Sequence, residues 1–156
     1  MPVRTINVKG ELLDLSHPAI MGILNITPDS FYSGSRRQSE MQIIERVSEI
    51  ISQGGAIIDI GAQSTNPKSE FLSAAVERER LRFALGVINR EFPEAILSID
   101  TFYGDVARFA VEEHGVAIIN DISGGQIDET MFDTVARLNV PYILMHMRGT
   151  PQTMQQ

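Results

Sequence analysis

Short apolar runs alternate along the chain with longer segments whose apolar residues recur at every third or fourth position. The short runs are rich in Ile, Val and Leu and occupy 19–24, 56–60, 95–99, 116–119 and 142–145. Apolar runs of this length are typical of buried strands, and the longer segments have the period of amphipathic helices. The alternation predicts βαβ units and therefore a parallel sheet that is buried on both faces.

The helical segments carry their own start and stop signals. The clearest one begins at Ser39, which forms a capping-box pair with Gln42, and it ends at Gly54-Gly55. The charged run from Glu77 to Arg82 is interpreted as the solvated face of another helix. Further helices are predicted at 72–90, 103–114 and 128–139.

The first residues follow a different pattern. Polar and apolar residues alternate from Val3 to Val8, and a second apolar segment runs from Leu12 to Leu15. Because Lys9-Gly10 lies between the two segments, the pattern predicts a small β-hairpin that turns at these two residues.

Each apolar run is followed by polar residues, and these residues indicate the fold class. They include Asn25, Asp59, Asp100, Asn120 and His146. The carboxyl ends of parallel strands form the ligand site in α/β folds, so a succession of polar ends favours a (β/α)8 TIM barrel over a doubly wound sheet. No glycine-rich nucleotide-binding motif follows any of the runs, which supports the same choice.

The length limits how much of a barrel the chain can form. A complete (β/α)8 barrel needs about 200–250 residues, whereas this chain has 156. We therefore expect an α/β fold that is a partial TIM barrel, with an amino-terminal hairpin and about the first five strands. Residues 1–156 would then be the amino-terminal portion of one domain. An exposed parallel edge invites association, so we expect a homodimer or pairing through the open edge.

Composition and charge narrow the possible partners. The chain has a formal charge of -7 and no Cys. These properties exclude disulfides and thiolate zinc sites, and they argue against binding to nucleic acid or to an anionic membrane. No apolar run reaches the ~20 residues of a membrane span. We therefore expect a cytoplasmic protein whose ligands are small molecules.

Five segments carry the candidate chemistry. They read MGILNITPDSF at 21–31, GGAIIDIGAQSTNP at 54–67, SIDT at 98–101, INDISGG at 119–125 and MHMRGTP at 145–151. In this order they resemble the signatures of dihydropteroate synthase, a family of pterin-binding TIM barrels. The resemblance extends over the chain from Ala19 onward and covers little more than the first half of the family's barrel.

The resemblance implies a transferase of folate biosynthesis. Such an enzyme transfers the 7,8-dihydropterin-6-ylmethyl group from its diphosphate ester to the amine of 4-aminobenzoate, releases pyrophosphate and uses Mg²⁺. Asp100 and Asn25 are the catalytic residues that it implies, and Asn25 resembles the residue that approaches the metal. The implied substrate contacts are Phe31, Asp59, Thr65, Pro67, Asp100, Asn120, Asp121 and Met145.

The chemistry of these residue types agrees with the resemblance. A dihydropterin ring presents N–H donors beside acceptors. The Asp100 carboxylate only accepts, whereas the Asn120 amide both donates and accepts. Unpaired buried polar groups cost ~1–3 kcal/mol each, so such a pair would favour a matching heterocycle. Bond breaking needs no covalent nucleophile, because the developing positive charge delocalises into the pterin, and the protein supplies placement and electrostatics.

Two positions depart from the family's pattern. Ser33 stands where the family usually has Asp, and Asn66 stands where it usually has Arg. Both changes remove a charge from loops that would order aminobenzoate and pyrophosphate. Arg36, Arg37 and Lys68 are close enough in sequence to compensate, and they are the candidate anion-binding residues.

Two alternatives stay open. A methyltetrahydrofolate-type pterin-binding domain shares the acids and amides that recognise the pterin, although the segments TPDSF and MHMRGTP favour the synthase. The second alternative is a non-catalytic, truncated association module. Because the family's later site residues are absent from these 156 residues, the isolated chain is expected to be weakly active or inactive. The synthase interpretation requires that Asn25, Asp100 and Asn120 lie together at one mouth of a curved sheet.

Overall fold

A two-stranded hairpin precedes a five-stranded parallel sheet in the computed structural model of the chain. The structure describes residues 4–27, 36–63 and 71–146, except for the side chains of 36 and 37. The hairpin consists of β1 (Thr5–Val8) and β2 (Glu11–Asp14). The sheet consists of β3 (Met21–Asn25), β4 (Ile57–Gly61), β5 (Ile96–Asp100), β6 (Ile118–Asp121) and β7 (Tyr142–Leu144). The helices are α2 (Arg36–Ser52), α3 (Ala74–Glu91), α4 (Gly104–His114) and α5 (Met131–Leu138).

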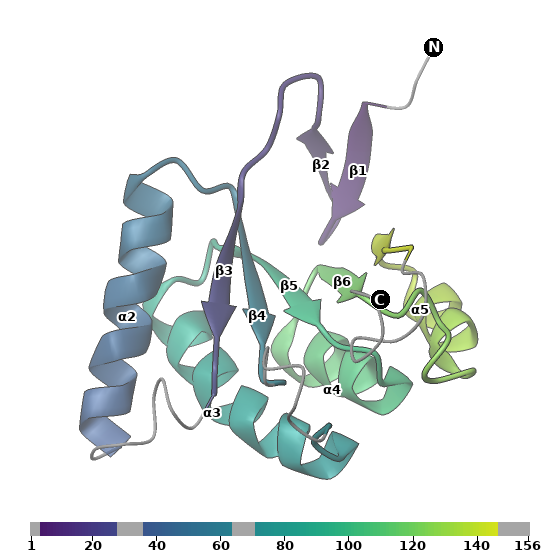
Figure 1. Cartoon of the computed structure of the whole chain (residues 1–156). Coiled ribbons are helices and arrows are strands. Elements are labelled where there is room, and N and C mark those ends of the chain that lie inside the picture. Colours follow the sequence, from purple (N-terminus) through teal and green to yellow (C-terminus); the bar gives the residue numbers. More distant parts are fainter. Residues whose placement is uncertain (1–3, 28–35, 64–70, 147–156) are drawn as a thin grey trace, which may run out of the picture.

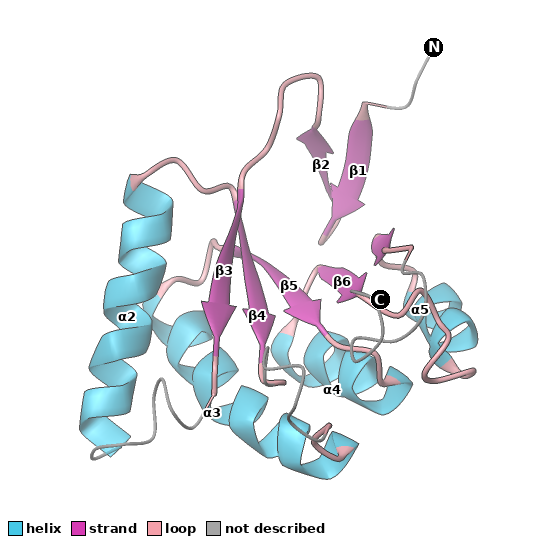
Figure 2. Cartoon of the chain, viewed as in Figure 1, coloured by secondary structure: helices cyan, strands magenta, loops and turns pink. Residues whose placement is uncertain are grey.

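The strands lie side by side in the order in which they occur in the sequence, β3-β4-β5-β6-β7. One described helix lies between each pair of consecutive strands, and each helix packs against the next (Figures 1 and 2). A doubly wound sheet reverses its strand order at a switch point, whereas a (β/α) barrel does not. The arrangement is therefore a partial barrel wall, as the alternation of apolar runs predicts.

The face of the sheet toward the helices is apolar. Leu24, Ile60, Ile99 and Ile119 are register partners in four neighbouring strands, and each is at most 1% exposed. They belong to a core cluster that also contains residues from the four helices. Because side chains alternate between the two faces of a strand, the residues before and after this row point to the opposite face, here called the inner face.

The hairpin covers the amino-terminal end of the inner face. Val8 of β1 packs with Ile57 and Ile118 in a second buried cluster. In Figure 1 the arrowheads of β3 and β4 point away from the hairpin, which leaves the carboxyl ends of the strands at the other end of the sheet. Lys9 and Gly10 have φ values of 54° and 87°, a left-handed pair that suits a two-residue hairpin turn. The hairpin predicted at these residues is confirmed.

The outer edge of β3 carries a side-chain contact. Arg46 of α2 donates hydrogen bonds from Nε and Nη2 to the carbonyl oxygen of Ile23, at 3.4 and 3.3 Å. Ile20 and Ile26, which flank β3, make backbone hydrogen bonds to the β4 segment. Because the backbone groups of a strand point alternately to its two sides, the carbonyl of Ile23 faces away from β4. A charged side chain therefore satisfies a backbone acceptor at a strand edge.

The structure corrects two expectations about boundaries and burial. Helix α2 begins at Arg36, so Ser39 lies inside the helix and is 3% exposed; the predicted capping box is wrong. Burial on both faces holds for β4 but not for the end strands, where Ile23 and Leu144 are 58% and 54% exposed. Ile23 is exposed because the hairpin covers only one end of the inner face and no described strand lies beyond β3. Leu144 is in register with Asp121, on the face toward the helices, and no helix after β7 is among the described residues.

Two glycines test how closely α2 packs on the sheet. A Cβ built at Gly22 of β3 would collide with Cγ2 of Ile50 in α2, whereas one built at Gly86 of α3 would meet no atom within 4 Å. Gly22→Ala should lower the free energy of unfolding by roughly 1–3 kcal/mol, because the core is overpacked. Gly86→Ala should raise it by about 0.5–1 kcal/mol through helix propensity. Urea unfolding of both variants checks this, and equal effects would contradict the close contact.

Candidate functional site

Polar residues that end the strands stand in one row on the inner face. Asn25 pairs with Gly61, Gly61 with Asp100, and Asp100 with Asn120. A Cβ built at Gly61 would lie 3.3 Å from Oδ2 of Asp100 and 3.5 Å from Oδ1 of Asn25. Both side chains therefore lean over the glycine from its two neighbouring strands. The expectation that Asn25, Asp100 and Asn120 lie together at one mouth of the sheet is confirmed; we call these three residues the polar row.

A hydrogen bond crosses the sheet directly behind this row. Nδ2 of Asn120 in β6 donates to Oδ2 of Asp59 in β4 at 2.9 Å. Strand β5 lies between the two, and its residues in the same rows are Ser98 and Asp100. The bond therefore spans β5 between Ser98 and Asp100. It also fixes the Asn120 amide, because the NH2 end faces Asp59 and the oxygen is the end that can accept from a ligand.

Two polar side-chain atoms near the hydrogen bond between Asn120 and Asp59 are buried and make no hydrogen bond among the described residues. They are Oδ1 of Asp59 and Oγ of Ser98. Asp59 is 6% exposed and Ser98 is fully buried. Buried polar groups of this kind are commonly satisfied by ordered water or by a ligand. The inner face behind the polar row therefore contains buried polar atoms, although the core that surrounds it is apolar.

The electrostatics of the site favour a neutral Asp100. Burial, followed by the negative charges of Asp59, Glu77 and Asp121, raises the pKa of the Asp100 carboxyl to about 7. At neutral pH this carboxyl is thus poised between its protonated and ionised forms. A ligand that offers N–H donors would draw it toward the ionised form.

Asp121 holds the loop that follows β6. Its Oδ1 accepts from the backbone N–H and the hydroxyl of Ser123, at 2.7 and 2.8 Å. Its Oδ2 accepts from the Gly125 N–H at 2.9 Å and from the Tyr142 hydroxyl at 2.7 Å. All four donors belong to the chain, so these bonds serve the loop rather than the polar row. Met145 follows β7 at the same end of the sheet and is 40% exposed.

Several predicted site residues lie outside the described part of the chain. The structure says nothing of Phe31, Ser33, Thr65, Asn66, Pro67 or Lys68. Arg36 and Arg37 begin α2, but their side chains are not described.

Glu77 is a buried acid near the site that the sequence pattern did not predict. Glu77 was expected on a solvated helix face, which is wrong, because it is fully buried in the first turn of α3. Its carboxyl accepts a short hydrogen bond from Nε2 of Gln63, two residues beyond the end of β4. The signal was present in the spacing: Glu77 lies four residues before Leu81, on the same stripe as Leu85 and Ile88.

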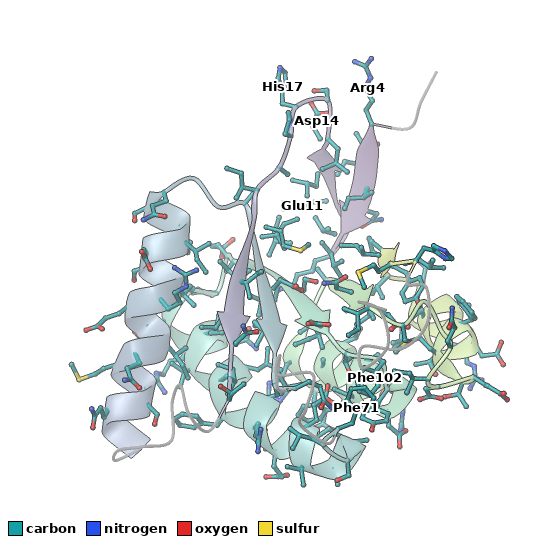
Figure 3. The ribbon with its side chains drawn as sticks, viewed as in Figure 1. Arg4, Glu11, Asp14, His17, Phe71 and Phe102 are labelled. Carbon is teal, nitrogen blue, oxygen red and sulfur yellow. The ribbon has the colours of Figure 1, made fainter. Side chains whose placement is uncertain are left out.

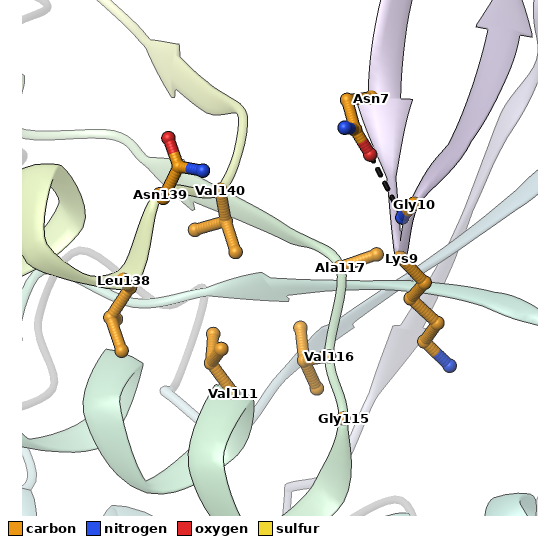
Figure 4. A pocket seen from close by; sticks show the side chains of 10 residues that line it. All are labelled: Asn7, Lys9, Gly10, Val111, Gly115, Val116, Ala117, Leu138, Asn139 and Val140. Carbon is orange, nitrogen blue, oxygen red and sulfur yellow. Dashed lines mark hydrogen bonds between the residues drawn. The ribbon is translucent and has the colours of Figure 1, made fainter.

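A cavity of about 310 Å³ lies at the opposite end of the sheet (Figure 4). Its lining includes Lys9 of the hairpin turn, Gly115 after α4 and Asn139 after α5. These positions precede β6 and β7, so the cavity is remote from the polar row.

None of the described helices is long and apolar enough to cross a lipid bilayer.

Comparisons with known sequences identify relatives of the chain. The family model described as pterin binding enzyme matches residues 21–156. The chain is 47% identical over 156 residues to the mitochondrial folate synthesis bifunctional protein of Pisum sativum, covering 97% of this chain and 30% of that protein. It is 38% identical over 148 residues to the dihydropteroate synthase of Escherichia coli K12, covering 95% of this chain and 51% of that enzyme. The chain thus spans 30% and 51% of the length of these two relatives.

Solved structures agree with the sequence relatives. The dihydropteroate synthase of Yersinia pestis, in complex with a sulfonamide drug, superposes with a TM-score of 0.82 at 34% identity, covering 97% of this chain and 54% of that chain. The Xanthomonas albilineans enzyme with 4-aminobenzoic acid gives a TM-score of 0.78 at 34% identity, covering 94% and 52%. The partial barrel is therefore shared with these enzymes. With a family match over residues 21–156, the chain belongs to the pterin binding enzymes.

Proposed function

We propose that this chain forms the pterin-binding part of a dihydropteroate synthase. The reaction transfers the 7,8-dihydropterin-6-ylmethyl group from its diphosphate ester to the amine of 4-aminobenzoate: a C–O bond to the diphosphate breaks, a C–N bond to the amine forms, and pyrophosphate and a proton leave. The observation that carries the proposal is the polar row, in which Asn25 and Asp100 face each other across Gly61, which has no side chain, and Asn120 lies beside Asp100.

The polar row matches the hydrogen-bonding edge of a pterin. The ring offers amino and N–H donors beside acceptors, and Asp100 supplies an acceptor when ionised. Asn120 can accept through its amide oxygen, because Asp59 already takes a bond from its NH2 group. The missing side chain at Gly61 gives a flat ring room between Asn25 and Asp100. Asn25, Asp100 and Asn120 are half-buried, so a ligand that covers them and leaves them unpaired loses ~1–3 kcal/mol for each, which favours a pterin over other rings.

The proposed transfer depends on placement and charge. As the diphosphate leaves, positive charge develops on the methylene carbon and spreads into the pterin ring. Asp100 in its ionised form would stabilise that charge at close range. The Asn25 amide oxygen suits Mg²⁺, which binds through few protein oxygens plus phosphates and water. When bound, Mg²⁺ would neutralise charge on the leaving diphosphate. Among the described residues no group of three or more acidic or His side chains is placed to hold a metal ion. Mg²⁺ at Asn25 would therefore take its other ligands from phosphate and water.

The remaining site residues and partners are proposed on the sequence alone. Arg36, Arg37 and Lys68 would hold the diphosphate or the aminobenzoate carboxylate, while Phe31, Thr65 and Pro67 would contact substrate. Association would use the open edge at β7, where Leu144 is 54% exposed. A cytoplasmic location also stays a prediction, and the pea relative is named as a mitochondrial protein.

Binding measurements test this function against the alternatives. We expect the chain to bind 6-hydroxymethyl-7,8-dihydropterin diphosphate with Mg²⁺ in preference to methyltetrahydrofolate, as measured by calorimetry. Asn120→Ala should weaken binding about tenfold or more, since a good polar contact to a ligand is worth at least 1.4 kcal/mol. Preference for methyltetrahydrofolate would replace the proposal with the second pterin-binding class. Failure to bind either compound, with a defined oligomer in solution, would favour an association module.

The titration of Asp100 predicts how affinity changes with pH. With a pKa of about 7, roughly a tenth of the carboxyls are ionised at pH 6 and nine tenths at pH 8. Because pterin donors need the ionised form, 6-hydroxymethyl-7,8-dihydropterin should bind about tenfold more weakly at pH 6 than at pH 8, and binding should release a proton. Asp100→Asn should remove this dependence. Asp105→Asn, at an exposed helix position, should keep it; a flat profile in the unmodified chain contradicts the assignment.

Removing the Asp59 carboxyl tests whether the bond across β5 orients Asn120. Asp59→Ala deletes the acceptor that holds the amide, so pterin affinity should fall by about 10- to 100-fold, as for other residues that orient ligand-binding groups. Asp105→Ala removes an exposed carboxyl of the same type and should leave affinity unchanged. Titration calorimetry on both variants, with unfolding curves to verify folding, decides the matter. Equal affinities of the two variants would show that Asn120 needs no support.

A further inference from the structure

Glu77 is a buried acid that the proposed transfer does not use. It is fully buried in the first turn of α3, and burial raises the pKa of its carboxyl, while hydrogen bonding by Thr101 and Gln63 and the charge of Arg80 oppose that rise. A buried carboxyl costs folding free energy, and a neutral apolar residue on the same stripe would avoid that cost. Its position calls for a role other than packing.

Glu77 accepts a hydrogen bond from the side-chain amide of Gln63. The Gln63 amide uses both of its ends: Oε1 accepts from the Leu72 N–H at 3.0 Å, and Nε2 donates to the Leu72 carbonyl at 3.4 Å and to Glu77. The Leu72 backbone and Glu77 require the same orientation of the amide, because the NH2 group must face both acceptors. Glu77 thereby stabilises the one orientation in which Gln63 can hold both backbone groups of Leu72.

The same backbone group ties Gln63 to the turn after Asp100. The Tyr103 hydroxyl donates to the Leu72 carbonyl at 2.9 Å, and we call the bonds of Gln63 and Tyr103 to Leu72 the Leu72 clamp. Next to it, the rings of Phe71 and Phe102 have centroids 4.8 Å apart, and Figure 3 shows the two side chains side by side. The clamp therefore joins residues that follow β4 to residues that follow β5.

We propose that Glu77 is a positioning residue of the pterin site: it holds Gln63 and, through the Leu72 clamp, fixes the turn that follows Asp100 at the end of β5. This inference rests on the proposed function, because it names a support for that site. The acid touches no part of the polar row itself in the described hydrogen bonds. Glu77 also takes a hydrogen bond from Thr101, the residue after Asp100, and its charge raises the pKa of Asp100. Gln63→Ala leaves Glu77 in place and therefore isolates the effect that passes through Gln63 and Leu72.

Hydrogen exchange at Leu72 measures the clamp directly. The Leu72 N–H is bonded to a side chain, so its exchange rate reports on Gln63. Glu77→Ala and Gln63→Ala should each accelerate it about tenfold or more relative to the Gly115 N–H, a helix-end amide at the other end of the sheet. Glu77→Gln keeps an acceptor for Nε2 and should restore the rate to within about threefold. Glu79→Gln, whose side chain is 72% exposed on the same helix, should leave it unchanged.

Ligand affinity then separates positioning from a purely structural role. With Mg²⁺ and 6-hydroxymethyl-7,8-dihydropterin diphosphate as the probe, Glu77→Ala and Gln63→Ala should weaken binding about tenfold, and Glu77→Gln should rescue it. An unchanged Leu72 rate in Glu77→Ala overturns the proposal, as does a faster rate with unchanged affinity. If the unmodified chain does not bind the probe, the proposed function fails instead, whatever the Leu72 rate shows. If Glu77→Ala does not fold, Gln63→Ala and Glu77→Gln decide by the same criteria.

Discussion

The register of the parallel strands is the constraint on which the rest of the structure depends. The last residues of β3, β4 and β5 are in register with one another and with Asn120, the residue before the end of β6, so their inner-face side chains meet in one row. A slip of one residue in β5 would turn Asp100 toward the helices and Ile99 toward the ligand side. The buried row of Leu24, Ile60, Ile99 and Ile119 resists that slip. Core packing and site geometry are thus consequences of the same pairing.

The site gathers acids at the expense of stability. Asp59, Glu77 and Asp121 all raise the pKa of Asp100, and their repulsion of an ionised Asp100 opposes folding. Asp121 is compensated by four donors from its own chain, whereas Asp59 keeps one buried oxygen without a partner among the described residues. Uncompensated buried groups of this kind are common where a protein keeps binding capacity for a ligand.

The sequence predicts the strands, their order and the polar row, because each of these follows from local patterns of apolar runs and their polar ends. The bond between Asn120 and Asp59 could not be predicted, since it joins strands that are not neighbours and depends on their register. Glu77 was assigned to solvent because it stands in a charged run, and only the packing of α3 on the sheet shows that it is buried. The prediction that Ser39 caps a helix was wrong for a similar reason: a capping pattern can also occur within a helix, and the pattern alone does not show where the helix begins.

The contact between Arg46 and the carbonyl of Ile23 has a consequence for how the chain meets other strands. Any strand that extends the sheet beside β3 must first displace the guanidinium group, which occupies the outward-facing acceptor. Strands that offer only a few backbone bonds gain too little to compete, so accidental pairing with other polypeptides is discouraged. A long partner strand in the correct alignment gains enough to displace it. Arg46 therefore raises the free-energy cost of adding a strand beside β3.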